Sequence, residues 1–101
     1  MLKKVQSLIN QKKYLVRLHA RERMLEREIT FQEVRETLEN SKIIEEYLDD
    51  RPFPSFLALG FTSNNRPLHT IWALKNETLV YLISVYEPDP EIWINFKERK
   101  K

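Results

Sequence analysis

The sequence contains no cysteine, only one glycine and no long apolar segment. Without cysteine the chain cannot form disulfides or thiolate metal sites, and with Gly60 alone it has no glycine-rich phosphate loop. Residues 79–83 are the longest apolar run, far short of the roughly 20 residues that cross a membrane. The basic N-terminus lacks the continuous apolar core of a signal peptide. We therefore expect a cytoplasmic protein that makes no membrane contact.

The composition predicts one folded domain over residues 1–101, because 42% of the residues are hydrophobic and 11% aromatic. The net charge of +2 hides a segregation along the chain. Residues 1–27 hold eight Lys or Arg against two Glu, whereas residues 28–50 hold two against eight acidic residues. This asymmetry favours a basic face that meets nucleic acid, and it is also compatible with pairing between the two segments.

The hydrophobic periodicity predicts helices first and strands afterwards. Helical spacing indicates helices over residues 2–12 and 20–27, the second facing inward through Ala20, Met24 and Leu25, and a third that starts after Thr30. Alternating patterns indicate strands over residues 42–48, 55–61, 68–75 and 78–86, with a short extended piece at 14–18. We therefore predict an α+β domain, with helices packed on one face of a mainly antiparallel four- or five-stranded sheet.

The third helix has a complete start signal in Thr30 and Glu33, whose side chains can form a capping box. Phe31, Val34 and Leu38 would face inward, and Asn40 would end the helix in a left-handed conformation. A further short helix is predicted after Asp89 as cap and Pro90 as first residue, with Ile92, Trp93 and Phe96 docked on the sheet.

The segment His19-Ala-Arg-Glu-Arg-Met-Leu-Glu-Arg27 carries the first candidate site. His19, Arg23 and Arg27 recur at intervals of four residues and so line one stripe of a helix. Arginines at this spacing repel each other and suit a negative partner such as a carboxylate or a phosphate. An imidazole beside them can move protons near neutral pH. The alternative is a solvated charged helix in which pairs such as Arg23 and Glu26 neutralise each other.

A second candidate lies on the last two strands. A two-residue turn at Asn76 and Glu77 would place His69 opposite Ser84 and bring Tyr86 to the same face. Ile71, Ala73, Val80 and Leu82 would continue that face as an apolar surface. The alternative for His69 is a half-buried strand histidine bonded to Ser84.

Two histidines at this separation do not form a metal-ligand spacing, and no nucleophile motif is present. The remaining chemistry is metal-free acid–base catalysis, in which histidine moves a proton and arginines stabilise negative charge. These groups suit RNA cleavage, where the 2′-hydroxyl attacks its own phosphate.

Three blocks of the sequence resemble a family of small bacterial domains of unknown function. They are the segment from His19 to Thr30, Arg66-Pro-Leu-His69, and Ser84-Val-Tyr-Glu-Pro-Asp89 followed by Trp93. The resemblance covers about residues 14–99, and Ser84 stands where the family more often has threonine. It implies a fold near the RelE/ParE-like and barnase-like toxins.

The resemblance also implies a toxin of a type II toxin–antitoxin pair that cleaves mRNA, alone or on the ribosome. Its partner would be a cognate antitoxin, in some relatives a zinc-finger protein. The catalytic candidates are His19, Arg23, Arg27, His69 and Tyr86, without metal or cofactor. Arg17, Lys97, Arg99 and Lys100 are the candidates for RNA binding.

Two alternatives stay open. In the first, the helix with His19, Arg23 and Arg27 binds and inhibits a protein target, as in ParE-like toxins. In the second, the domain is a general nucleic-acid-binding module, which the near-balanced charge does not favour.

Overall fold

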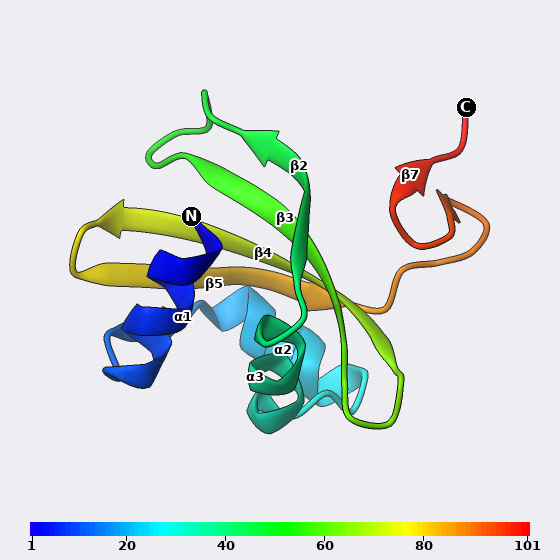
Figure 1. The fold of residues 1–101 in the computed structure, drawn as a ribbon, viewed down its shortest axis with the longest axis horizontal. Coiled ribbons are helices and arrows are strands. Elements are labelled where there is room, and N and C mark those ends of the chain that lie inside the picture. The colour runs from blue at the N-terminus through cyan, green and yellow to red at the C-terminus, as the bar shows by residue number, and fades with distance from the viewer.

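The computed structural model describes residues 1–101 as three helices packed on one face of a five-stranded sheet (Figure 1). The helices are α1 (Leu2–Asn10), α2 (Leu18–Glu26) and α3 (Phe31–Leu38). The sheet contains β1 (Tyr14–Val16), β2 (Lys42–Tyr47), β3 (Ser55–Phe61), β4 (Pro67–Asn76) and β5 (Leu79–Tyr86). A separate hairpin near the C-terminus consists of β6 (Trp93–Ile94) and β7 (Glu98–Arg99). None of the helices has the length and apolar character needed to cross a membrane.

The strand order is β1-β5-β4-β3-β2, in which β1 runs parallel to β5 and the other neighbours are antiparallel. The predicted α+β class and the mainly antiparallel sheet are therefore confirmed, with five strands in the sheet. The short extended segment before His19 is the edge strand β1. It delivers the chain directly into α2 beside β5.

The core lies between the helices and one sheet face. Its fully buried members include Val5, Val34, Phe56, Trp72 and Leu82. Trp72 also satisfies its indole N–H inside the core, because Nε1 donates to Thr70 Oγ1 at 2.8 Å. Burial of such side chains supplies the main stabilisation of the fold, about 1.5–3 kcal/mol for each fully buried large aliphatic or aromatic residue.

The predicted capping box of α3 is confirmed. Glu33 N donates to Thr30 Oγ1 at 3.1 Å, and Thr30 N donates to Glu33 Oε1 at 3.0 Å. Hydrogen bonding to the Thr30 backbone, supported by the charge of Arg66, lowers the pKa of Glu33. The predicted inward residues Val34 and Leu38 are buried, and Phe31 packs against the core.

Several predicted helix limits were wrong by a few residues. The first helix ends at Asn10, because Lys12 takes a left-handed backbone conformation with φ of 60°. The second begins at Leu18, so His19 lies in its first turn. Leu25 was predicted to face inward, but its side chain is 77% exposed; Ala20 and Met24 alone contact the core.

The predicted left-handed stop at Asn40 was also wrong. Asn40 instead uses its amide to join the end of α3 to β3: Nδ2 donates to Phe61 O at 2.9 Å, and Oδ1 accepts from Phe61 N at 2.7 Å. This exchange satisfies the backbone N–H and C=O groups of Phe61. The helix therefore ends without a left-handed turn at Asn40.

No helix follows Asp89, contrary to the prediction. Asp89 Oδ1 accepts from Glu91 N at 2.8 Å, but the chain completes only a turn before β6. Asn95 and Phe96 have φ of 51° and 66° and reverse the chain into β7, which a helix does not allow. Trp93 is buried as predicted and Phe96 half-buried, whereas Ile92 is exposed.

The predicted hairpin register was wrong because β4 and β5 contain two irregularities. Asn76 pairs with Leu79, so Glu77 and Thr78 form the turn. A second shift between Ile71 and Trp72 places Tyr86, not Ser84, opposite His69. A bulge reverses which residues face each side of a sheet. Val80 and Leu82 accordingly face the helices, while Ile71 and Ala73 share the opposite face with Tyr81 and Ile83.

The single glycine lies where α3 meets β3, and its lack of a side chain is required there. A Cβ on Gly60 would come within 2.5 Å of Thr37 O and 2.7 Å of Ser41 Oγ. Ser41 Oγ itself donates to Thr37 O at 2.6 Å, so this backbone junction has little room to move.

We predict that Gly60→Ala lowers the free energy of unfolding by about 1–3 kcal/mol through overpacking. Urea denaturation followed by circular dichroism measures the loss. Ala58→Gly on the same strand is the contrasting change, because it removes a methyl group from the core and adds none. Unchanged stability of Gly60→Ala would show that the junction relaxes freely.

Candidate functional site

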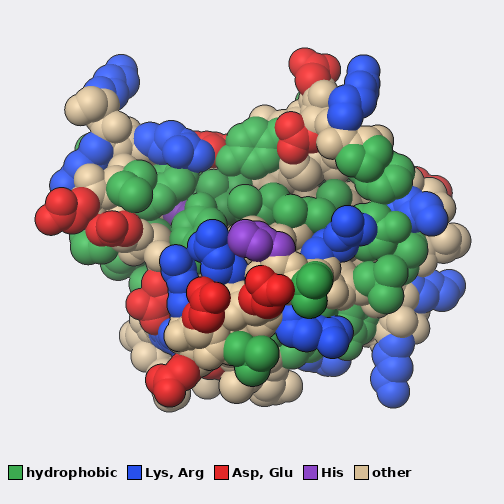
Figure 2. Space-filling model, turned by 180° about the vertical axis from the view of Figure 1, so that it is seen from behind, with side chains coloured by type: hydrophobic (Ala, Val, Ile, Leu, Met, Phe, Trp, Pro, Cys, Tyr) green, Lys and Arg blue, Asp and Glu red, His purple; other side chains and the backbone are tan.

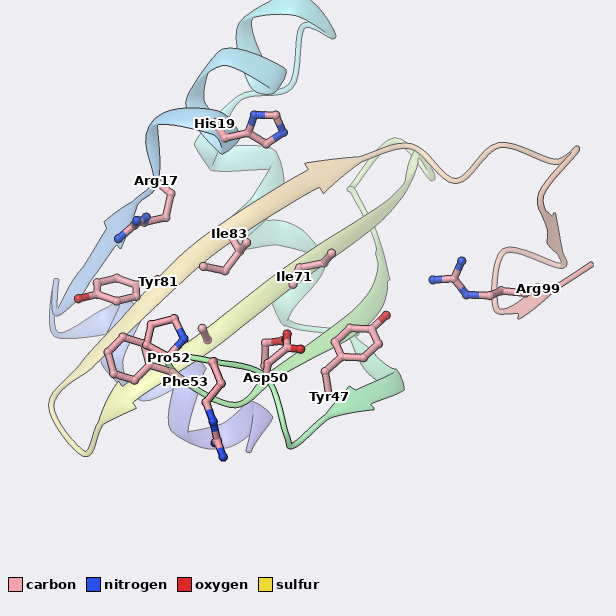
Figure 3. Close-up of a pocket in the computed structure, with 13 residues that line it drawn as sticks. Arg17, His19, Tyr47, Asp50, Pro52, Phe53, Ile71, Tyr81, Ile83 and Arg99 are labelled. Atoms are coloured by element: carbon pink, nitrogen blue, oxygen red, sulfur yellow. The ribbon is translucent and has the colours of Figure 1, made fainter.

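The sheet face opposite the helices is hollowed into a trough of about 660 Å³. We define the trough by its floor and two walls (Figure 3). The floor comes from β4 and β5 and contains Ile71, Ala73, Tyr81 and Ile83. One wall is the start of α2, with Arg17 and His19; the other is the end of β2 and the following loop, with Tyr47, Asp50, Arg51, Pro52 and Phe53. Its remaining lining residues are Ser55 and Arg99.

His19 is the exposed histidine of the chain, and it lies at the lip of the trough. It occupies the first turn of α2, which starts where Arg17 leaves β1 in an extended conformation. The Arg17 guanidinium lies 5.3 Å from the centre of the Tyr81 ring, a cation–π distance that holds it over the floor. An imidazole and a guanidinium thus line the same wall, and neither is paired with a carboxylate.

Arg23 and Arg27 line an adjoining cavity of about 330 Å³, whose other lining residues are Tyr86, Glu87, Asp89, Ile92, Trp93 and Arg99. Arg99 borders both the trough and this adjoining cavity. Neither Arg23 nor Arg27 forms a salt bridge. The acidic segment therefore does not neutralise the α2 arginines: Glu45 pairs with Arg99, and Asp50 with the Ser55 hydroxyl.

The space-filling view shows how these charges are distributed (Figure 2). A histidine imidazole lies between Lys or Arg side chains, at the border of a band of apolar side chains. Carboxylates lie close by on the same face, so the surface is mixed and not uniformly basic. The geometry favours a ligand that combines negative charge with an apolar or aromatic part.

His69 has no exposed surface, and both of its ring nitrogens are hydrogen-bonded. Nε2 lies 2.5 Å from Phe96 O, and Nδ1 lies 3.2 Å from Tyr86 Oη. A carbonyl oxygen only accepts, so Nε2 carries the proton and Nδ1 accepts from the Tyr86 hydroxyl. The Trp93 ring packs edge-to-face against the His69 imidazole, with the two ring centres 4.5 Å apart. Burial lowers the pKa of His69, which favours the neutral form that this arrangement requires.

Tyr86 connects the buried histidine to the adjoining cavity. Its hydroxyl is oriented by His69, and burial raises the pKa of Tyr86, so the phenol stays protonated at neutral pH. His69 therefore acts on the cavity only through Tyr86. Its burial argues against direct proton transfer to a substrate, and a catalytic role of His69 stays a prediction.

Arg99 fastens the C-terminal hairpin to the edge of the sheet. Its Nε and Nη2 atoms donate to the two oxygens of Glu45 at 2.8 and 3.1 Å, and its guanidinium lies 4.7 Å from the Trp93 ring centre. The bond from Arg99 lowers the pKa of Glu45. Burial, together with a hydrogen bond to Glu45, raises the pKa of Tyr47 to about 12.

The structure separates the four predicted RNA-binding residues. Arg17 and Arg99 line the trough, whereas Lys97 lies beside a different cavity with Phe61 and Phe96. Lys100 is exposed and lines none of these cavities. Sequence reasoning missed the opposite wall, above all Asp50, Arg51 and Phe53. The proline-flanked segment 51–54 signalled a strand break, and its aromatic and charged residues were the available sign of a site.

No group of three His, Asp or Glu side chains converges in a way that could hold a metal ion. The chemistry available at the trough is that of an imidazole, several guanidiniums and one carboxylate. Together these groups can bind a phosphate and move a proton.

Fold and site thus define a small α+β domain with an arginine-bordered trough on its open sheet face. Residues 16–87 match the model of a family described as a domain of unknown function (DUF4258), and the chain belongs to that family. The match includes both walls and the floor of the trough; α1 and the C-terminal hairpin lie outside it. No curated protein and no solved structure matches the chain.

We predict that acidification destabilises the protein through His69. In the unfolded chain a histidine titrates near pH 6.5, whereas the pKa of His69 is lower in the fold. The unfolded state therefore binds more protons than the folded state. The contribution of His69 to the free energy of unfolding is fully present above about pH 6.5 and declines as the pH falls below it. The decline is at most about 1.4 kcal/mol per pH unit.

The measurement is urea denaturation between pH 7.5 and 5.5, for the wild type and for His69→Gln. A glutamine can still donate to Phe96 O but does not titrate. The variant should be less stable at pH 7.5 and should lose less on acidification. Parallel pH profiles would show that His69 does not cause the dependence. Glu33 and Glu45 titrate below this range and so do not disturb the comparison.

We predict that Arg23→Ala and Arg27→Ala each change the free energy of unfolding by less than about 1 kcal/mol, as expected for side chains without ion pairs. Arg66→Ala is the contrasting variant, because Arg66 binds two carboxylates and two backbone carbonyls. Its loss should reach about 2 kcal/mol or more. A loss of that size for Arg23→Ala would identify a structural role and remove Arg23 from the site.

Proposed function

We propose that this domain is a metal-independent RNA endonuclease and the toxin component of a toxin–antitoxin pair. The observation that carries the proposal is the exposed His19 at the lip of a trough bordered by the unpaired Arg17 and Arg51. Arg23 and Arg27 bring two further guanidiniums to the adjoining cavity, which Glu87 and Asp89 also line. A single strand of RNA offers the matching features, namely a charged backbone and flat, stackable bases.

The reaction needs two proton transfers and no outside reagent. The RNA 2′-oxygen attacks the adjacent phosphorus and loses its proton; the bond from phosphorus to the 5′-oxygen breaks, and that oxygen gains a proton. The products are a 2′,3′-cyclic phosphate and a free 5′-hydroxyl. His19 is the exposed imidazole available for one of these transfers.

The arginines would stabilise the extra negative charge on the phosphate oxygens as the bond to the 2′-oxygen forms. Guanidinium groups suit this task because they stay charged and can donate two parallel hydrogen bonds to a phosphate. Arg23 and Arg27 are free for it, whereas Arg99 is already held by Glu45. The Tyr86 hydroxyl, oriented by His69, would position the chain of the RNA in the adjoining cavity.

The toxin assignment rests on the resemblance of three sequence blocks to a family of small bacterial domains, which implies a likeness to RelE/ParE-like toxins. The same resemblance makes mRNA, free or on the ribosome, the proposed substrate. An antitoxin would silence the domain by covering the trough. Because the walls of the trough carry Arg17, His19 and Arg51, the covering segment should be acidic.

The decisive experiment is cleavage of a defined single-stranded RNA in EDTA. We predict that the wild type releases fragments with cyclic phosphate ends and that His19→Ala slows cleavage at least about 100-fold, the usual contribution of a general acid or base. Arg21→Ala is the matched control, since Arg21 is exposed on the same helix and lines none of the cavities.

Cleavage that stops in EDTA would contradict the metal-free mechanism. Equal loss in His19→Ala and Arg21→Ala would indicate that the helix acts only through its charge. Intact RNA at every concentration of wild-type protein would overturn the nuclease proposal.

One observation favours a second function, inhibition of a protein target through α2. Leu18 and Leu25 lie two turns apart on this helix and are 71% and 77% exposed. Exposed leucines on one helix face often mark a protein contact. Under this proposal RNA stays intact, Arg23→Ala abolishes a stoichiometric complex, and Leu25→Glu does so as well.

A further inference from the structure

One end of the trough combines an aromatic surface with an isolated carboxylate. Phe53 packs against Tyr81 with ring centres 5.8 Å apart, and the apolar floor of Ile71 and Ile83 continues from them. Asp50 projects from the β2–β3 loop into this space, across the trough from His19 (Figure 3). This end of the trough thus presents an apolar floor and, in the wall formed by the β2–β3 loop, the carboxylate of Asp50.

The Asp50 carboxylate is held in place by a single neighbour. Its Oδ2 atom accepts from the Ser55 hydroxyl at 2.7 Å, and it forms no salt bridge, although Arg51 is the next residue. Ser55 lies at the buried start of β3, so it fixes the carboxylate against the sheet. Each carboxylate oxygen can accept about two hydrogen bonds, and Oδ1 in particular has none from the protein.

A carboxylate in this position distinguishes the four RNA bases by their hydrogen-bonding edges. Guanine presents two adjacent N–H donors, at N1 and at the 2-amino group, which match the two oxygens of one carboxylate. Adenine and cytosine place an acceptor beside their amino group, which a carboxylate repels. Uracil offers one N–H between two acceptors. Charge and geometry therefore favour guanine at Asp50.

We propose that this end of the trough is a base-recognition site for guanine, with Asp50 as the specificity-determining residue and Phe53 and Tyr81 as its apolar support. The phosphate on the 3′ side of the bound guanosine would lie toward the wall of Arg17 and His19. The volume of about 660 Å³ lies within the range of small-ligand sites and admits one nucleotide. This inference rests on the proposed RNA-cleaving function for its biological role, but binding tests it independently.

The experiment is calorimetric titration of the full chain with guanosine, adenosine, cytidine and uridine 3′-monophosphates. The wild type should bind the guanosine nucleotide at least about fivefold more tightly than each of the others, as expected for one bidentate contact. Asp50→Asn should abolish this preference. The amide oxygen can still accept from the Ser55 hydroxyl, but the amide NH₂ then faces the N–H donors of guanine and cannot bind them. Asp49→Asn is the matched control, since it removes the same charge from the exposed neighbour that does not line the trough.

Equal affinity of the wild type for all four nucleotides would overturn the inference, as would an unchanged preference in Asp50→Asn. If Asp49→Asn and Asp50→Asn weaken the preference equally, the loop charge and not the Asp50 contact is responsible, and the inference also fails.

Sequencing of RNA fragments separates failure of the guanine site from failure of the nuclease proposal. Cleavage after all four bases with normal dependence on His19 would refute only the guanine site. Guanine-selective binding without any cleavage would refute only the nuclease.

Discussion

The junction of α2 and α3 with the sheet depends on the set of bonds made by one arginine. The Arg66 guanidinium donates to Glu33 on α3, to Glu87 after β5, and to the carbonyl oxygens of Arg27 and Glu28 at the end of α2. It thereby joins the end of α2 and the start of α3 to the start of β4 and the end of β5. Helix ends leave carbonyls without intrahelical partners, and a cation there satisfies them and also complements the helix dipole.

This junction explains why Arg23 and Arg27 remain available. Glu33 accepts from the Thr30 backbone in the capping box and forms a salt bridge with Arg66, and Glu87 also forms a salt bridge with Arg66. Glu45 is taken by Arg99 at the other end of the sheet. The structural arginines therefore bind Glu33, Glu45 and Glu87, and neither Arg23 nor Arg27 forms a salt bridge, although Asp89 lines the same cavity. Electrostatic repulsion between Arg23 and Arg27 then favours an external anion.

The sequence was sufficient for the fold class and for much of its local structure. Residues 55–61 were predicted as a strand with the limits that the structure has, and Thr30 with Glu33 predicted the start of α3. These features are local: alternation of side chains and one capping box decide them. The register of β4 and β5 was not predictable, because the irregularities at Ile71 and Leu74 depend on packing against the rest of the sheet.

The candidate site was predictable only in part, for the same reason. His19, Arg23 and Arg27 share a helix, so their spacing alone places them together. The burial of His69 depends on Trp93 and Phe96, which reach it because Asn95 and Phe96 reverse the chain. The wall with Asp50 and Phe53 depends on how the β2–β3 loop folds over the sheet. No local pattern specifies either arrangement.

The two histidines have different surroundings, although the sequence presents both as acid–base candidates. His69 is buried, fixed in one tautomer and favoured in its neutral form, so it can orient Tyr86 but has no path to solvent for a proton. His19 is exposed at the trough and has no hydrogen-bond partner that fixes its ring. Proton transfer requires a group that reaches its substrate, and of the two histidines only His19 is exposed. The C-terminal hairpin creates this division, because its Trp93 and Phe96 close over one histidine and leave the other open.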